Sequence, residues 1–161
     1  MIIKATIADI PAIQQIACET WPETYGGILS QEQIDYMLQW MYDAAFIQQQ
    51  MLEGHQFYLL KENSEATGFI DVQMISVTET KLHKIYLLPA MQGKGYGQLL
   101  INKAKAFAAA HHAETLILNV NRHNAALGFY QKNGFVIIEE KDIPIGNGYF
   151  MNDYILEWKV K

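Results

Sequence analysis

The chain has 161 residues, of which 50% are apolar, and a formal net charge of −5 at pH 7. This length predicts one domain with a sizeable core, and the acidic balance disfavours a nucleic-acid surface. No apolar stretch approaches the roughly 20 residues of a membrane span. The first residues lead directly into a helix-cap pattern, so no signal peptide is expected and a reducing cytoplasm is the default location. The single cysteine, Cys18, cannot form a disulfide within the chain, and its apolar neighbours predict a buried position.

The first half of the chain carries mainly the periodicity of helices. Pro11 suits a first helical turn, where its missing N–H costs nothing, and Ser30 with Gln33 forms a capping-box pattern. The segment 21–27, Trp-Pro-Glu-Thr-Tyr-Gly-Gly, is predicted to break the first helix, either as an aromatic binding loop or as a packed corner. The predicted elements are a short strand at 2–5 and helices from about residue 10 to this break, over 31–40 and over 44–53.

The second half of the chain alternates strands with helices. Short turns join three successive strand patterns, which predicts an antiparallel meander, and Gly68 is expected to mark a bulge or a close approach. A long helix then separates the third of these strands from the next one, so those two strands should run parallel. The predicted strands cover 57–61, 67–76, 85–88, 115–120, 135–140 and 149–160, with a short helix at 124–133.

A glycine-rich loop at 92–98, Gln-Gly-Lys-Gly-Tyr-Gly-Gln, lies between a strand that ends at Pro89 and the long helix. Glycines let backbone N–H groups approach a ligand, and a helix N-terminus favours an anion, so this loop predicts a phosphate site. A P-loop is excluded because Lys94 is followed by Gly95 instead of Ser or Thr, and the dinucleotide fingerprint lacks its third glycine. The pattern alone also fits a plain strand-to-helix connection.

Two motifs resemble the signatures of one enzyme family, the GCN5-related N-acetyltransferases (GNAT). Gln92-x-x-Gly95-x-Gly97 resembles the family's acetyl-CoA pyrophosphate loop. The second motif matches the family's other signature at Asn124, Phe129, Tyr130, Gly134 and Phe135. In many relatives the asparagine lies one residue further from the tyrosine, which leaves both Asn121 and Asn124 as candidates for the cofactor contact. The N-terminal helices and the tail loosely resemble small-molecule or polyamine-type members.

The resemblance implies a single GNAT domain over residues 1–161. The implied fold is mixed α/β, with a central, mostly antiparallel twisted sheet of about seven strands, one splayed parallel pair and about four flanking helices. The implied function is direct transfer of acetyl from acetyl-CoA to a primary amine of a small molecule, in a ternary complex without a covalent enzyme intermediate. The alternative is a non-catalytic CoA-binding sensor or scaffold of the same fold. Neither nucleic acid nor membrane is an expected partner, and a homodimer stays open.

The resemblance also implies which residues contact the cofactor. The strand before the glycine loop would pair its backbone with the pantetheine arm, and the loop amides would bind the pyrophosphate. Lys94, Arg122 and His123 could add positive charge, or could simply be solvated. The implied cofactor-binding residues are Ile85, Tyr86, Leu87, Gln92, Gly93, Lys94, Gly95, Tyr96, Gly97, Gln98, Asn121, Asn124 and Tyr130.

Acetyl transfer to an amine needs a base, because alkyl ammonium groups have a pKa of about 10.4. The candidates for this base are His83, Asp71, Glu79 and Asp153, and Asp153 could instead bind the cationic acceptor. Tyr130 matches the family's general acid and would protonate the departing thiolate.

An aromatic wall with an acidic group suits a cation with an apolar body, so the acceptor pocket is predicted across the sheet from the pyrophosphate. The residues predicted to line it are Trp21, Tyr25, Tyr36, Tyr149 and Asp153. The alternative is that these aromatic residues close the core or form a dimer contact. No cluster of ligands predicts a metal site.

Overall fold

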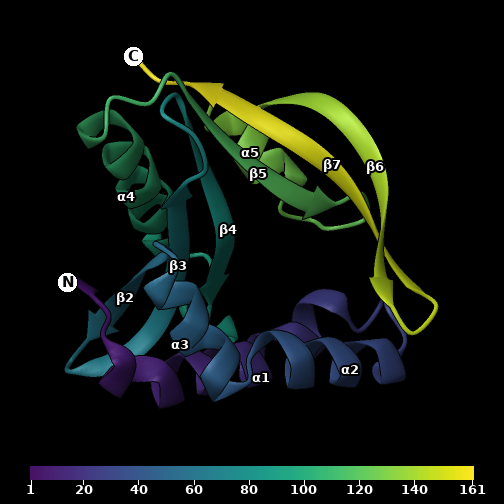
Figure 1. Ribbon diagram of the computed structural model, residues 1–161. Helices are drawn as coiled ribbons and strands as arrows, with labels where there is room; N and C mark the ends of the chain where they lie inside the picture. The colour runs from purple at the N-terminus through teal and green to yellow at the C-terminus, as the bar shows by residue number, and fades with distance from the viewer.

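A seven-stranded sheet in the order β1-β2-β3-β4-β5-β7-β6 organises the computed structural model, which describes residues 1–161 (Figure 1). The strands are β1 (Ile2–Lys4), β2 (Gln56–Glu62), β3 (Glu65–Met74), β4 (Glu79–Leu87), β5 (Thr115–Asn121), β6 (Val136–Gly146) and β7 (Tyr149–Lys159). The helices are α1 (Ile10–Tyr25), α2 (Gln31–Met41), α3 (Ala44–Leu52), α4 (Tyr96–Ala110) and α5 (Leu127–Lys132). No helix in the fold is both long and apolar enough to cross a bilayer.

One pair of neighbouring strands, β4 and β5, is parallel, and all other pairs are antiparallel. These two strands pair only over Glu79–Leu82 and Thr115–Leu118. Beyond these residues they part, as Figure 1 shows. The side of β4 that faces β5 therefore has no strand partner from His83 to Leu87. The predicted antiparallel meander and the parallel splayed pair are both confirmed.

The sheet separates two apolar cores. On one face, α4 and α5 pack against the sheet through residues such as Leu100, Phe107 and Tyr130. On the other face, α1, α2 and α3 cover it with residues that include Ile13 and Met37. The two cores fix the helices on both sides of the point where β4 and β5 part.

Two predictions about the first helix are wrong. The helix is not broken at Trp21, because α1 continues to Tyr25 with Pro22 inside it. Proline removes one helical hydrogen bond, but Trp21 and Tyr25 are buried in the core, and this packing keeps the turn helical. Cys18 is exposed instead of buried, since the helical period that turns Ile16 and Ala17 inward turns Cys18 toward solvent.

Other predicted boundaries shift by a few residues. The short helix covers only Leu127–Lys132, and the strand expected to end at residue 140 continues as β6 to Gly146. The prediction for Gly68 is confirmed. A Cβ there would lie 2.9 Å from the backbone oxygen of Tyr86 and 3.0 Å from Leu87 Cδ1. The register between β2 and β3 also shifts beside Gly68.

We expect Gly68→Ala to lower the free energy of unfolding by about 1–3 kcal/mol, because the added methyl group has no room between β3 and β4. Urea unfolding followed by circular dichroism measures this change. Gly128→Ala is the matched control, since a Cβ at Gly128 meets no atom within 4 Å. Equal stabilities for the two variants would contradict the close approach.

Candidate active site

A cleft of about 820 Å³ opens where β4 and β5 part. It is lined from one side by β4 and the glycine loop (residues 92–98), and from the other by β5 and the segment around α5. The C-terminal part of α1 closes one end with Thr20, Glu23, Thr24 and Tyr25. The cleft therefore brings together the two sequence motifs, which are far apart in the chain.

The glycine loop presents bare backbone to the cleft. Gly93 and Gly95 have φ of +77° and +85°, a left-handed conformation that favours glycine. A Cβ at either position would meet no atom within 4 Å, so the space beside these amides is open. Gly95 is also the N-cap of α4, where unpaired N–H groups and the helix dipole favour an anion. This cradle fits the pyrophosphate of a coenzyme A group.

The structure separates the predicted loop residues into two groups. Gln92, Gly93, Gly95, Gly97 and Gln98 line the cleft. Lys94 is exposed and lies outside the lining. Tyr96 is also outside it, because its hydroxyl donates to Glu62 Oε1 at 2.8 Å.

Strand β4 supplies the wall next to this loop. Ile85, Tyr86 and Leu87 all line the cleft, and their backbone on this side has no partner in β5. The hydroxyls of Tyr86 and Tyr25 lie 3.2 Å apart, and burial raises the pKa of Tyr86 well above its usual value. An extended chain could therefore pair with the free edge of β4, with two neutral phenols beside it.

The second motif places Tyr130 in the opposite wall. Its side chain lines the cleft, and its ring packs edge-to-face against Phe129 and Phe135. Burial, reinforced by Tyr25, raises the pKa of Tyr130 above its usual value. The phenol therefore keeps its proton throughout the neutral range.

The two candidate asparagines occupy different environments. The Oδ1 of each accepts a backbone hydrogen bond at 2.9 Å, from the His123 amide to Asn121 and from the Ala126 amide to Asn124. Asn124 lines the cleft, whereas Asn121 is buried and does not. The geometry thus favours Asn124 for a ligand contact. Arg122 is engaged with Glu140 and Asp142, so its guanidinium is already neutralised.

The two leading candidates for the base are placed differently. His83 lines the cleft. Burial lowers the pKa of its imidazole to about 4, so the ring is neutral at pH 7. Asp153 on β7 lies behind the lining and is 4% exposed. Its Oδ2 accepts from Asn119 Nδ2 at 3.4 Å, its Oδ1 has no partner, and burial raises the pKa of this carboxyl.

The predicted aromatic wall is only partly in the cleft. Tyr25 lines it, but Trp21 is 1% exposed and belongs to the core. Tyr36 and Tyr149 pack together with ring centroids 5.4 Å apart, and the Tyr36 hydroxyl donates to the Ile145 carbonyl. This pair joins α2 to the β6–β7 hairpin. Of the five residues predicted to line the acceptor pocket, only Tyr25 lines the cleft, and Trp21, Tyr36, Tyr149 and Asp153 do not.

Several residues that line the cleft are not positions of either sequence motif. Asn119 lies between Leu118 and Val120, two apolar residues of β5. Because side chains alternate along a strand, the sequence could have shown that Asn119 points to the opposite face of the sheet from these two residues. Glu23 and Thr24 also line the cleft. They fall within segment 21–27, which was predicted as a possible binding loop, but the structure places them in α1. Gln73 does not line the cleft, but its side chain binds His83, and no pattern in the sequence indicated this contact.

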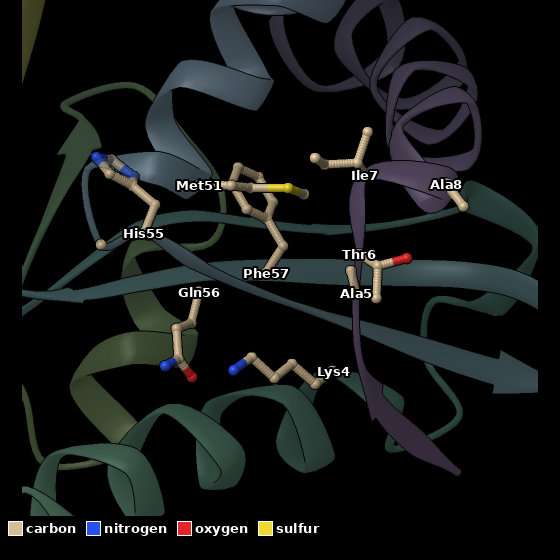
Figure 2. Close-up of a pocket in the computed structure, with 10 residues that line it drawn as sticks. Lys4, Ala5, Thr6, Ile7, Ala8, Met51, His55, Gln56 and Phe57 are labelled. Atoms are coloured by element: carbon tan, nitrogen blue, oxygen red, sulfur yellow. The ribbon is translucent and has the colours of Figure 1, made fainter.

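A second cavity of about 460 Å³ lies between β1, β2 and the end of α3 (Figure 2). Lys4, Thr6, Met51 and His55 are among its lining residues. None of the residues of the two motifs lines this cavity, so the larger cleft is the candidate active site.

Comparisons with known proteins agree with this geometry. The acetyltransferase (GNAT) family model matches residues 10–135. The spermidine N(1)-acetyltransferase of Thermoplasma acidophilum is 27% identical over 162 residues, which cover 97% of this chain and 94% of that protein. The [ribosomal protein bS18]-alanine N-acetyltransferase of Haemophilus influenzae is 32% identical over 100 residues, or 61% of this chain and 64% of that protein.

A solved structure extends the similarity to three dimensions. The crystal structure of the PaiA N-acetyltransferase from Thermoplasma acidophilum in complex with coenzyme A has a TM-score of 0.85 at 27% identity, and the match covers 99% of this chain and 98% of that one. The family match spans both motifs and most of the sheet. The chain therefore belongs to the acetyltransferase (GNAT) family and is an N-acetyltransferase that uses acetyl-CoA.

Proposed function

We propose that the chain transfers the acetyl group of acetyl-CoA directly to a primary amine of a small molecule, within a ternary complex. The observation that carries this proposal is the single cleft that joins a phosphate-fitting glycine loop to Tyr130 and His83. The similarity to a spermidine N(1)-acetyltransferase over nearly the whole chain supports a small amine as the acceptor. A sensor or scaffold would need the glycine loop but would not need a proton donor such as Tyr130.

The proposed cofactor contacts follow the lining of the cleft. The amides of Gly93, Gly95 and Gly97 would bind the pyrophosphate, and the free edge of β4 would align the pantetheine arm. Asn124 would contact the same ligand from the opposite wall. Bound acetyl-CoA would supply the activated acyl group as a thioester, and the backbone N–H groups of β4 could stabilise the oxyanion that develops on attack.

The residues of the cleft would then move protons. An ammonium group must first lose a proton, which His83 or a water bound to it would accept. The new C–N bond forms as the C–S bond breaks, and Tyr130 would donate its proton to the departing sulfur. The second proton of the amine is released as the amide forms, and solvent returns the Tyr130 hydroxyl to its neutral state. No protein nucleophile takes part, since Cys18 lies on the outer face of α1.

Asp153 is proposed to attract the cationic acceptor. No ion pair joins it to a lysine or arginine, and its Oδ1 is buried without a partner. A nearby ammonium group would stabilise its charged form and so lower the raised pKa of the carboxyl. Acceptor binding should therefore strengthen as the pH rises through the pKa of Asp153.

A panel of amines tests the function itself. Polyamines, aminoglycosides, amino acids and peptides with free N-termini are each incubated with acetyl-CoA, and thiol release and the acetylated product are measured. Small amines, polyamines above all, should be acetylated faster than peptides. Preferential acetylation of peptide N-termini would overturn the small-molecule proposal. Tight CoA binding without transfer to any amine would favour the sensor.

We expect Gly95→Val to abolish CoA binding while the fold remains intact. Valine is strained at a positive φ and would fill the open space beside the loop amides. Isothermal titration calorimetry measures the affinity. Gly148→Val is the matched control, because Gly148 has a φ of +77°, close to the +85° of Gly95, and likewise has open space around it, but it lies in the turn before β7. Micromolar CoA affinity in the Gly95 variant would show that the loop is not the site.

Tyr130→Phe should lower kcat by about 10²–10⁴ while CoA affinity changes little, because only the proton donor is lost. Steady-state kinetics with the best amine and direct CoA titration separate the two effects. Tyr58→Phe, whose hydroxyl binds Gln56 outside the cleft, is the control. Normal turnover by the Tyr130 variant would assign this residue a structural role.

Asp153→Asn should raise the KM for the amine about 10-fold or more and leave CoA affinity unchanged, since a charge-assisted contact contributes about 1.5–3 kcal/mol. Glu157→Gln, on the same strand, is the control. If CoA affinity falls and the acceptor KM stays constant, the acceptor pocket has been placed on the wrong side of the cleft.

A further inference from the structure

We propose that Gln73 is a positioning residue that holds His83 as the tautomer with hydrogen on Nε2, which leaves Nδ1 as the atom that accepts the proton of the acceptor amine. This inference rests on the proposed function, because it names the atom that performs its first proton transfer. It assigns a role to a glutamine that neither motif contains.

A bulge in β4 places His83 at the cleft. Asp71 of β3 pairs with Lys84, but the next residue, Val72, pairs with Leu82. His83 is therefore the extra residue of the strand, and a bulge re-aims the side chain it carries. It also stands at the point where β4 loses its partner in β5. His83 is two residues from Ile85, about 7 Å along an extended strand, so one water can connect it to an amine near the free edge.

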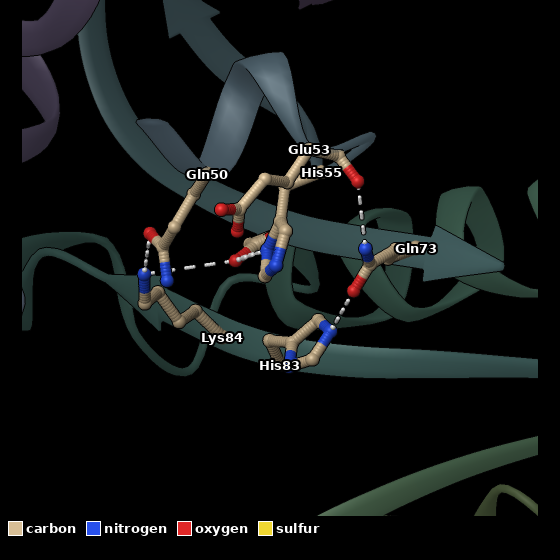
Figure 3. Close-up of polar contacts among 7 residues, drawn as sticks. Gln50, Glu53, His55, Gln73, His83 and Lys84 are labelled. Carbon is tan, nitrogen blue, oxygen red and sulfur yellow. Dashed lines mark hydrogen bonds and ion pairs between the residues drawn. The ribbon is translucent and has the colours of Figure 1, made fainter. Parts of the chain in front are cut away.

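A chain of hydrogen bonds fixes the tautomer (Figure 3). Gln73 Nε2 donates to the backbone carbonyl of Glu53 at 3.1 Å. A carbonyl can only accept, so the amide nitrogen of Gln73 must point toward Glu53 and its oxygen toward His83. That oxygen lies 2.9 Å from His83 Nε2, which must then carry the hydrogen. In a neutral imidazole the other nitrogen, Nδ1, is left with a free lone pair.

Neighbouring groups hold the imidazole ring in place. The His55 ring stacks on His83 with centroids 4.3 Å apart. His55 is itself fixed, because its Nδ1 lies 2.9 and 2.8 Å from the two carboxylate oxygens of Asp71. Asp71 is fully buried and lies 3.6 Å from Lys84 Nζ, which also donates to Gln50. His83 makes no hydrogen bond through Nδ1, so the bond to Gln73 is the one hydrogen bond of its side chain.

Burial, together with the neighbouring cationic groups, keeps His83 neutral. Burial is the main cause of its lowered pKa, Asp71 opposes this effect, and His55, Lys81 and Lys84 add to it. At neutral pH the imidazole is therefore uncharged and its Nδ1 lone pair is free. With a pKa of about 4, His83 is a weaker base than an alkyl amine, whose conjugate acid has a pKa of about 10.4, so proton transfer from R–NH₃⁺ is uphill and goes forward because the freed amine is consumed by attack on the thioester. The products of this step are R–NH₂ and a protonated imidazole, which returns its proton to solvent after the amine has attacked.

Nuclear magnetic resonance tests the tautomer without any need for activity. In protein with ¹⁵N-labelled histidines, long-range ¹H–¹⁵N correlations distinguish a protonated from a free ring nitrogen, and His83→Gln identifies the signals. His83 should show hydrogen on Nε2 and a free Nδ1. Gln73→Leu should produce a mixture of tautomers. A wild-type His83 with hydrogen on Nδ1 would overturn the inference.

Steady-state kinetics test whether Gln73 affects turnover and its pH dependence through His83. Gln73→Leu should lower kcat about 10-fold or more with unchanged CoA affinity. Gln73→Glu keeps an acceptor for the Nε2 hydrogen and adds a negative charge, which favours protonated imidazole. The acidic limb of its kcat/KM profile should therefore move to higher pH by about 1–2 units. Because the glutamate variant keeps the size and the acceptor oxygen, it remains informative if the leucine variant does not fold.

Gln49→Leu is the matched control. Gln49 lies on α3 and donates to the side chain of the same Glu53, but it does not contact His83. This variant should keep the wild-type tautomer, kcat and pH profile. If the enzyme acetylates amines and both Gln73 variants behave like this control, the inference is wrong. If no amine is acetylated, the proposed function fails, while the tautomer result stands or falls separately.

Discussion

The site depends on one constraint, the end of pairing between β4 and β5. After Leu82, β4 remains paired only with β3, while β5 follows β7 over its full length from Thr115 to Asn121. Each half of the sheet is thus held by its own antiparallel neighbour, and the two halves diverge. A row of unpaired backbone groups would be costly in an apolar interior. It is tolerated here because these groups border a cleft that water or a ligand can enter.

The parted strands also explain how two distant motifs meet. The glycine loop follows β4, and α5 with Tyr130 follows β5, so each motif is attached to one half of the sheet. The core on the α4 face includes Leu82 and Leu100 from the first half and Leu118, Tyr130 and Leu156 from the second. The width of the cleft is therefore set by close-packed side chains, which change their spacing only at considerable cost. Such a site is largely preformed before any ligand binds.

The sequence predicted those features that side chains determine. The apolar periods located nearly all the strands and helices, and the glycines at 93 and 95 marked the loop correctly. The sequence could not reveal the bulge at His83 or the length of the β4–β5 pairing, because backbone pairing leaves no pattern of side chains. Pro22 was misleading, since the packing of Trp21 and Tyr25 outweighs the loss of one helical hydrogen bond. Tyr36 and Tyr149 were attractive as a pocket wall for their composition, but tertiary contacts use them to dock α2 on the last hairpin.

The buried charged side chains next to β4 affect the pairing register of β4 with β3 more than they affect the free energy of unfolding. Asp71, His55 and Lys84 form a network with almost no solvent contact, and such networks often contribute little more than well-packed apolar groups would. Their position is informative, because Asp71 pairs with Lys84 directly beside the bulge. A shift of one residue would turn every following side chain of β4 to the opposite face, moving Tyr86 from the α1 core to the side of α4. A buried carboxylate that must meet both His55 and Lys84 disfavours that slip, since the slipped strand would leave Asp71 without its lysine. The polar network thereby helps to determine which backbone groups of β4 face the cleft.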